Sequence, residues 1–207
     1  MKTFECEEKV ILESAGVYVL GFYHTSGKDV FYVEIGLRTH IQMLLIFDLN
    51  NTLVYRQYKN DNKALEYPTP DFIIRDFHVW KRPGLDTFIQ SCFQQTDVDI
   101  AVWTSAFRYN AIPVVEAIFG QFMNRLKFVY CREECSNVRN TNRDHSSAKD
   151  LQLVWDRFPD YNAFNTRVLE DSTEKYSPCF HHLITLVRKW TPDMQDDTEL
   201  SISKQFL

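Results

Sequence analysis

Residues 41–54 read IQMLLIFDLNNTLV, and this stretch decides the fold of the chain. Its apolar run from Met43 to Phe47 has the length of a strand and does not alternate with polar residues. Such a run is typical of a strand buried on both faces of a parallel sheet. Asp48 follows directly, where the strand leaves the core. The stretch therefore predicts an α/β domain with a carboxylate at the C-terminal end of a buried strand.

The rest of the chain alternates between apolar strand-like runs and helix-like segments. Further strands are predicted at VDIAVWTSA (98–106), LKFVY (126–130), NTRVLEDST (165–173) and HLITLVRKW (182–190). Helices are predicted at residues 81–95, 110–120 with Pro113 in the first turn, 148–158 and 197–207, and a polar loop at 132–147. This alternation indicates βαβ units, and so a Rossmann-like, mainly parallel sheet with helices on both faces.

Two β-rich segments interrupt or precede this pattern. GVYVLGFYH (16–24) and VFYVEIGL (30–37), joined through a glycine-containing turn, predict an N-terminal β-hairpin. Residues 55–80 predict a small β insertion after the first core strand, with short strands such as DFIIRDFHVW. We therefore expect an N-terminal β-rich accessory segment at residues 1–40 and an α/β domain at residues 41–207.

Composition limits the classes of function. The chain has 207 residues, of which 44% are hydrophobic and 25% charged, as in a globular domain. Its net charge of −5 argues against nonspecific nucleic-acid binding through a basic face. No apolar stretch reaches the ~18 residues of a membrane helix, and the N-terminus lacks a secretory pattern. Five cysteines at irregular spacing favour a reducing compartment, nuclear or cytoplasmic, and leave the oligomeric state undecided.

The strand ends predict where a ligand binds. In open α/β sheets the ligand site lies beyond the C-terminal ends of the strands. Asp48, Thr104 and Asp171 each follow an apolar strand at that end. Carboxylates and hydroxyls gathered there are suited to a phosphoryl-transfer site, which needs a nucleophile, groups that hold phosphate oxygens, and a metal.

The order of the short motifs resembles one phosphatase family. DLNNTLV (48–54) is similar to the nucleophile loop of the haloacid dehalogenase superfamily, whose usual pattern is DxDxT. The motifs that follow are KRPGLDTF (81–88), VWTSA (102–106), YCREEC (130–135), AKDL (148–151) and VLEDST (168–173). Over residues 42–200 they resemble the small phosphatases that act on the C-terminal domain of RNA polymerase II, and their relatives.

The resemblance implies a role for each matching residue. Asp48 would be the nucleophile that becomes an aspartyl-phosphate, and Thr52 would complete its loop. Thr104 would hydrogen-bond the phosphoryl group, and Lys149 would neutralise the charge of phosphate and nucleophile. Arg132 falls where the family has an arginine near the substrate. The implied substrate is phosphoserine or phosphothreonine in a protein or peptide.

The resemblance also implies Mg²⁺ as the cofactor. Asp171 would be a metal ligand with Glu170 beside it, together with Asp48 and the backbone carbonyl of residue 50. Oxygen ligands of this kind suit Mg²⁺, which keeps several waters and binds few carboxylates.

Asn50 departs from the family pattern, which has its second aspartate there. That aspartate protonates the leaving group and then activates water, and an amide does neither. General acid–base catalysis contributes ~10²–10⁴-fold, so Asn50 predicts a large loss of turnover, while the carbonyl contact to metal is retained. Three explanations stand: a natural pseudophosphatase, a slow enzyme in which Glu170 or water substitutes, or an Asp→Asn change that traps a substrate.

Other interpretations compete with these. The domain could be a binding module for a phosphopeptide or protein partner, or a small-metabolite phosphatase, although the short insertion leaves no large cap for the latter. Ser105 competes with Thr104 for the hydroxyl role. Candidate zinc ligands are Cys131, Cys135 and His145, and, as a second group, Cys179, His181 and His182.

Overall fold

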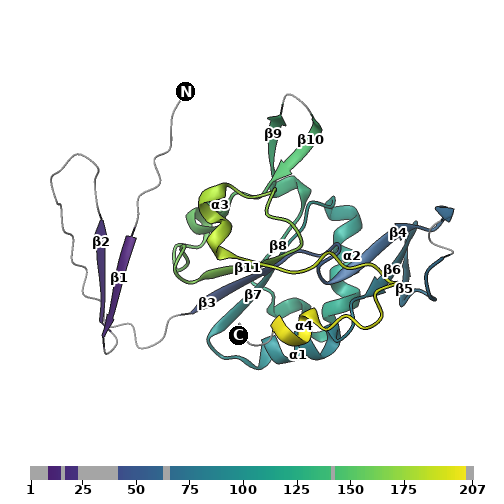
Figure 1. The fold of residues 1–207 in the computed structure, drawn as a ribbon, viewed down its shortest axis with the longest axis horizontal. Coiled ribbons are helices and arrows are strands. Elements are labelled where there is room, and N and C mark those ends of the chain that lie inside the picture. Colours follow the sequence, from purple (N-terminus) through teal and green to yellow (C-terminus); the bar gives the residue numbers. More distant parts are fainter. Residues whose placement is uncertain (1–8, 15–16, 23–41, 63–65, 141–142, 204–207) are drawn as a thin grey trace. The chain divides into compact units, whose positions relative to one another are not determined.

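The computed structural model describes residues 9–14, 17–22, 42–62, 66–140 and 143–203. It divides into two compact units, Met1–Ile41 and Gln42–Leu207. In the first unit, strands β1 (Lys9–Ser14) and β2 (Val17–Phe22) form an antiparallel hairpin (Figure 1). Strand β1 lies before residues 16–24, the segment that was expected to form the first strand of the hairpin. The expected partner strand at residues 30–37 lies outside the described residues, so that pairing stays a prediction.

The second unit is built on a parallel sheet of five strands in the order β12-β11-β3-β7-β8. The strands are β3 (Met43–Phe47), β7 (Val98–Trp103), β8 (Val129–Tyr130), β11 (Thr166–Glu170) and β12 (Ile184–Leu186). The chain builds outward from β3 on one side and then returns to build β11 and β12 on the other. Such a reversal of strand order marks the usual ligand site of an α/β sheet, and Asp48 lies at the end of its central strand.

Helices cover both faces of this sheet, as predicted. Side chains of β3 alternate between two cores because successive residues of a strand point to opposite faces. Phe47 packs with α1 (Leu85–Gln94) and α2 (Arg108–Phe119), its ring 5.3 Å from that of Phe88. Leu44 and Ile46 belong to the other core, with α3 (Leu151–Arg157). A short helix, α4 (Glu199–Ser203), follows near the end of the described chain.

The predicted β insertion is a three-stranded antiparallel sheet in the order β4-β6-β5. Its strands are β4 (Val54–Tyr58), β5 (Phe72–Ile74) and β6 (Phe77–Lys81). Trp80 of this sheet packs with Trp190, Tyr55 and Tyr67 in a small core of its own. The insertion therefore begins six residues after the nucleophile-loop aspartate and is anchored to the C-terminal part of the chain.

Two local predictions were wrong. Residues 132–147 are not a loop: a 3₁₀ turn, η3 (Arg132–Glu134), leads into a hairpin of β9 (Ser136–Asn140) and β10 (Arg143–Ala148). Backbone pairing satisfies these strands although their sequences show no apolar alternation. Pro113 lies inside α2, not in its first turn, because the helix begins at Arg108. The remaining 3₁₀ segments are η2 (Gly120–Arg125) and η4 (Pro178–Leu183).

A buried ion pair joins distant parts of the domain. Arg82 donates to Asp197 from Nε at 2.8 Å and from Nη2 at 2.9 Å. The same guanidinium donates to the carbonyl oxygens of Thr52 at 3.1 Å and Arg188 at 2.9 Å. Both side chains of the pair are fully buried. Arg82 thus ties the loop after β3 to the C-terminal segment. Within the described ranges, every helix is too short or too polar to cross a bilayer.

Candidate active site at the end of β3

The loop after β3 makes a tight turn that aims its side chains beyond the sheet. The carbonyl of Leu49 accepts hydrogen bonds from the amides of Leu53 and Val54, each at 2.9 Å. Asn51 has a φ of 59°, in the left-handed region that Asn tolerates better than most residues. The amide of Asp48 donates to the carbonyl of Leu169 at 3.0 Å. The turn therefore holds Asp48 at the junction of β3 and β11.

Asp48 lies in a buried cluster of opposite charges. Lys149 Nζ is 2.9 Å from Asp48 Oδ1 and 2.5 Å from Glu170 Oε2. All three side chains are buried, with Asp48 the most exposed at 2%. A charged side chain that is buried away from water needs a partner of opposite charge. The ammonium and the two carboxylates therefore stabilise one another. The structure thus brings together three residues that the sequence analysis named, from β3, β11 and the segment before α3.

A second lysine completes the cluster. Lys175 Nζ donates to Glu170 Oε1 at 2.9 Å and lies 3.5 Å from Asp48 Oδ2. Its third carboxylate neighbour is Asp171, whose Oδ1 is 3.7 Å away. The hydroxyl of Tyr176 donates to Glu170 Oε2 at 3.3 Å. Both carboxylate oxygens of Glu170 are therefore occupied by cations of the chain.

The surroundings of Asp48 and Lys149 shift the pKa values of these two residues. Burial raises the pKa of Asp48, although Lys149 and Lys175 oppose this effect. Burial by itself lowers the pKa of Lys149, but the charges of Asp48 and Glu170 outweigh it and raise the value to about 12. Lys149 is thus a permanent cation at neutral pH. The two lysines offset part of the cost that burial imposes on ionised Asp48.

Two oxygens of this cluster are suited to a metal ion. Asp48 Oδ2 and Asp171 Oδ1 are buried and have no hydrogen-bond partner. Carboxylate oxygens of Asp48, Glu170 and Asp171 also lie within 4.8 Å of one another. Buried, unsatisfied carboxylate oxygens are costly unless a cation is near, and hard oxygen ligands fit Mg²⁺. The residues present therefore fit a divalent ion held by Asp48 and Asp171.

Asn50 is held by a residue of the insertion. Arg56 on β4 donates from Nε to Asn50 Oδ1 at 2.7 Å, and from Nη1 to the carbonyl of Asn110 at 3.5 Å. Because a guanidinium has no acceptor, this contact orients the amide with its oxygen toward Arg56. The side chain of Arg56 lies close enough to Asp48 for the two charges to interact. Asn50 therefore has its NH₂ group left to donate.

The remaining predicted residues lie at the same edge of the sheet as Asp48. Thr104 follows β7, whose Val102 is level with Phe47. Its Oγ1 accepts from the amide of Ala106 at 3.3 Å, while the buried Ser105 Oγ has no hydrogen-bond partner.

Two more residues complete the predicted set. Thr52 Oγ1 is buried and likewise lacks a hydrogen-bond partner. Arg132 begins η3 and its guanidinium lies 5.6 Å from the ring of Phe107. The structure therefore leaves the choice between the Thr104 and Ser105 hydroxyls open and places Arg132 beside an aromatic ring.

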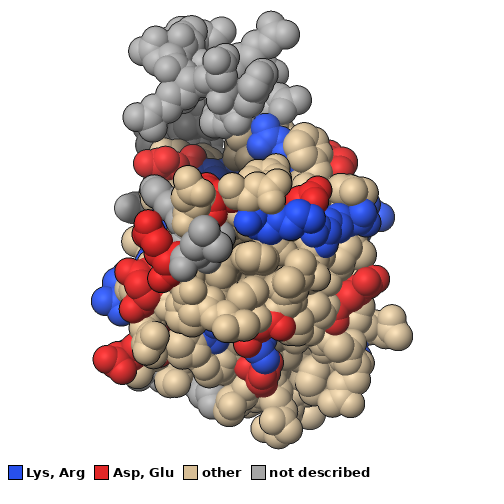
Figure 2. Space-filling view, turned by 90° about the vertical axis from the view of Figure 1, so that its right-hand side faces the viewer, with Lys and Arg blue, Asp and Glu red and all other residues tan. Residues whose placement is uncertain are grey.

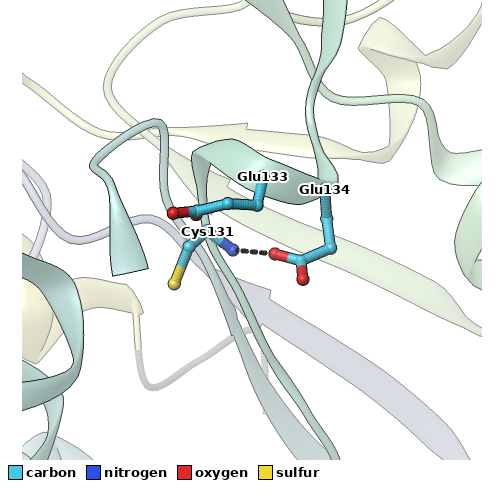
Figure 3. A group of neighbouring side chains, drawn as sticks. All are labelled: Cys131, Glu133 and Glu134. Atoms are coloured by element: carbon cyan, nitrogen blue, oxygen red, sulfur yellow. Dashed lines mark hydrogen bonds between the residues drawn. The ribbon is translucent and has the colours of Figure 1, made fainter. Parts of the chain in front are cut away.

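The zinc hypothesis gains no support from the first cysteine group. Figure 3 shows Cys131 beside Glu133 and Glu134, with the Cys131 amide donating to Glu134 at 2.7 Å. Both glutamates also contact Arg108, whose amide donates to Glu133 at 3.1 Å. Burial raises the pKa of the Cys131 thiol to about 11, so it is not a thiolate at neutral pH.

The other zinc candidates are equally unsupported. The side chain of His145 lies outside the described residues. Cys179, His181 and His182 form no ligand group among the side chains that the structure describes.

Comparison with known proteins identifies the family. The family model described as NLI interacting factor-like phosphatase matches residues 43–207. The chain belongs to this family. Its match spans the parallel sheet, the insertion and the whole Asp48 cluster. The predicted resemblance to phosphatases of the haloacid dehalogenase type that act on the RNA polymerase II C-terminal domain is thereby confirmed at the level of the family.

A solved structure supports the fold. The fission yeast RNA polymerase II CTD phosphatase Fcp1, bound to beryllium fluoride, has a TM-score of 0.52 and 14% sequence identity, over 74% of this chain and 43% of that one. A second Fcp1 structure has a TM-score of 0.49 and 14% identity, over 80% and 49% respectively. The chain thus spans less than half the length of these two relatives. No curated protein gives a significant match.

Sequence reasoning missed three residues of this candidate site in the NLI interacting factor-like phosphatase domain. Lys175 lies four residues after Asp171, and a lysine placed so soon after paired carboxylates was the signal that could have indicated it. Arg56 sits on β4 two residues after Val54, on a strand read only as part of an insertion. Tyr176 carries no signal in the sequence, since a buried aromatic is usually part of a core.

Proposed function

We propose that this domain binds phosphoserine or phosphothreonine segments of proteins with Mg²⁺ and accepts the phosphoryl group on Asp48, with hydrolysis limited by Asn50. One observation carries the proposal. Asp48 is a buried carboxylate at the sheet's switch point, with Oδ1 held by Lys149 at 2.9 Å and Oδ2 without a hydrogen bond. An aspartate that only stabilised the fold would have both oxygens satisfied.

Each neighbour of Asp48 has a part in this proposal. Lys149 keeps the nucleophile ionised and offsets negative charge that phosphate brings into the buried site. The hydroxyl of Thr104 or Ser105 donates to a phosphoryl oxygen. Asp48 and Asp171 would hold Mg²⁺, which, when bound, screens the charges of nucleophile and phosphate so that they can approach.

The proton balance predicts where the reaction stops. When Asp48 attacks phosphorus, the bond between phosphorus and the serine or threonine oxygen breaks, and that oxygen must gain a proton. Asn50 has no acidic proton to give, and its Oδ1 already accepts from Arg56. Hydrolysis of an aspartyl-phosphate then needs a base to take a proton from water, which an amide is not. Both steps are therefore expected to be slow, and the bound or phosphorylated state to persist.

Glu170 is a poor substitute for the missing aspartate. Its Oε2 contacts the ammonium of Lys149 at 2.5 Å and its Oε1 that of Lys175 at 2.9 Å. The hydroxyl of Tyr176 is a third donor, at 3.3 Å. Both oxygens are thus taken by donors of the chain, whereas a general acid needs a carboxyl oxygen that faces the leaving group. Of the three explanations for Asn50, substitution by Glu170 is thus the least favoured by these contacts.

The surroundings of the site suit a protein substrate. Large side chains are exposed on the insertion and at the start of α2, namely Tyr58, Ile73, Phe107 and Tyr109. Figure 2, which looks onto the insertion, shows broad uncharged surface crossed by one row of Lys and Arg, with acidic residues interspersed. An extended phosphopeptide can use both apolar contacts and a few cations. A nucleic acid would need a more uniformly basic face.

The contact between Asn50 and Arg56 favours a second candidate, a binding module without turnover. The amide contributes an NH₂ donor, which can hold a phosphoryl oxygen, where the family pattern has an acid. A domain that binds phosphopeptide through Lys149 and Asn50 but does not cleave it would use the same residues. The two candidates differ only in whether phosphate is released.

Phosphate release separates them. We would measure Mg²⁺-dependent release from p-nitrophenyl phosphate and from a Ser-Pro phosphopeptide by the unaltered chain, Asn50→Asp and Asn50→Asp with Asp48→Asn. We expect slow or no release by the unaltered chain, an increase of ~10²-fold or more for Asn50→Asp, and none when Asp48 is also replaced.

Each other outcome has a definite meaning. Inert Asn50→Asp protein that still binds the phosphopeptide leaves the binding module as the function. Activity that survives Asp48→Asn identifies a different nucleophile and ends the proposal. Rapid release by the unaltered chain would show that the proton comes from a group other than residue 50.

A further inference from the structure

Lys175 lies where the candidate metal ligands converge. Its Nζ is 2.9 Å from Glu170 Oε1, 3.5 Å from Asp48 Oδ2 and 3.7 Å from Asp171 Oδ1. These carboxylates are the same three that form the metal-ligand group. The two longer contacts reach the oxygens of Asp48 and Asp171 that have no hydrogen-bond partner. An ammonium therefore already supplies positive charge at the point where a divalent ion would.

The two lysines of the cluster divide the oxygens between them. Lys149 contacts Asp48 Oδ1 and Glu170 Oε2, while Lys175 contacts Oδ2 and Oε1 of the same two carboxylates. Only Lys175 also reaches Asp171. Lys149 can therefore stay in place when a metal binds through Asp48 Oδ2, whereas Lys175 cannot, because like charges so close together repel strongly.

Of the two lysines, Lys175 is the one whose side chain can move into solvent. Its side chain is 27% exposed, whereas that of Lys149 is fully buried. It stands in the connection between β11 and η4, and not within a strand or helix. Its contacts with Asp48 and Asp171 are ion pairs without a hydrogen bond, which are weaker than a direct charge-assisted hydrogen bond.

We propose that Lys175 is a tethered cation that competes with the divalent ion for Asp48 and Asp171, and so sets the affinity of the site for metal. This inference rests on the proposed Mg²⁺ site. Without metal, the ammonium offsets repulsion among the carboxylates. When metal binds, the side chain of Lys175 swings toward solvent. Metal affinity is thus lower than the ligand set alone would provide.

Metal titration of the whole chain tests this inference. Isothermal calorimetry with MgCl₂, and with MnCl₂ as a second probe, would compare the unaltered chain with Lys175→Met, Lys175→Gln and Asp171→Asn. Lys189→Met is the matched control, since it removes the same charge from an exposed position. We expect Lys175→Met to tighten metal binding roughly tenfold or more, because a repelling charge is removed. The control should change nothing and Asp171→Asn should lose binding.

The outcomes separate this inference from the proposed function. Equal affinity in Lys175→Met and the unaltered chain, with loss in Asp171→Asn, leaves the metal site but overturns the competition. Weaker binding in Lys175→Met also overturns it, because Lys175 would then help to hold the ion. Binding by Lys175→Met alone supports the competition and removes Mg²⁺ from the function of the unaltered chain. No binding by any variant overturns both.

A footprint on the unaltered chain guards against a variant that fails to fold. Amine-reactive labelling, read by mass spectrometry, would follow Lys175 and Lys149 with and without saturating MgCl₂. Displacement predicts greater labelling of Lys175 when metal is present, and no labelling of buried Lys149 in either state. Unchanged or reduced labelling of Lys175, at a metal concentration that calorimetry shows to be saturating, overturns the inference.

Discussion

Lys149 places its ammonium 2.9 Å from Oδ1 of Asp48, and the two residues are 101 positions apart in the chain. Both side chains are buried, and the pKa of Lys149 is raised to about 12, so Lys149 is protonated at neutral pH. The pair is therefore both a structural element of the core and the electrostatic setting of the candidate nucleophile. Replacing Lys149 and replacing Asp48 are therefore expected to have opposite effects on the stability of the domain.

Replacing Lys149 should destabilise the domain. Lys149→Met leaves Asp48 and Glu170 as buried carboxylates with Lys175 as the remaining ammonium beside both, and breaking a buried pair costs about 3–5 kcal/mol. Urea unfolding at pH 7 would measure this loss. The loss should shrink toward pH 4, where carboxyl groups without Lys149 take up protons. Lys59→Met, which removes an exposed ion pair with Asp76, should change stability by less than about 1 kcal/mol. Similar effects of the two substitutions would contradict a buried, ionised Lys149.

Replacing Asp48 should do the reverse. Burial raises the pKa of Asp48 above its ordinary value of 3.8. A carboxyl group with a raised folded pKa lends stability that is fully present below that ordinary value and is lost as pH rises through the folded pKa. Asp48→Asn, which keeps an oxygen for Lys149, should therefore stabilise the metal-free domain at pH 7 by about 0.5–2 kcal/mol. This gain in stability should disappear below pH 3.8, the ordinary pKa of an aspartate. Thermal melts at both pH values measure it, and a lower melting temperature at pH 7 contradicts it.

Arg56 should control the pH profile of a restored enzyme. Its contact with Asn50 Oδ1 at 2.7 Å predicts that a carboxylate introduced by Asn50→Asp meets the same guanidinium. An opposite charge at this range lowers a carboxyl pKa by about 1–3 units, so a smaller fraction of the group is protonated near neutral pH, as a general acid must be. Adding Arg56→Gln should move the high-pH decline of kcat/KM upward by about one pH unit. Arg75→Gln, which removes an arginine stacked on Tyr109 at 3.6 Å, is the control. If the high-pH decline of kcat/KM shifted with Arg75→Gln but not with Arg56→Gln, the contact between Arg56 and residue 50 would be refuted.

The Arg82–Asp197 pair should govern stability in acid. Burial raises the pKa of Asp197, but its hydrogen bonds and charge contact with Arg82 have a larger effect in the opposite direction. The net result is a pKa below the ordinary value of 3.8. A lowered carboxyl pKa lends stability that is present above the ordinary value and is lost as pH falls through the folded pKa. The free energy of unfolding should therefore drop as pH falls below that value in the unaltered chain, and less steeply in Asp197→Asn. Asp196→Asn, at an exposed neighbour, should keep the steep drop, and a flat profile in the unaltered chain contradicts the pair.

Much of the fold was predictable because its signals are local. The apolar run Met43–Phe47 predicted a buried strand, and strand β3 has these bounds. The helix predicted at residues 81–95 is α1, which spans Leu85–Gln94. Burial on one or both faces of an element leaves a repeat in the sequence, whatever the element packs against. The hairpin of β9 and β10 left no such repeat, and it was missed.

The sequence by itself determined the order of the motifs along the chain, the carboxylate Asp48 at a strand end, and the amide at position 50. Tertiary structure alone decided which charges meet. Lys149 and Asp48, like Arg82 and Asp197, are more than 100 residues apart, and only the packing of the sheet sets their distance. The same packing puts Lys175 against three carboxylates and Arg56 against Asn50. The reason is physical: a pattern along the chain reports which face of an element is buried, but a charge finds its partner only when the folded chain excludes water from both.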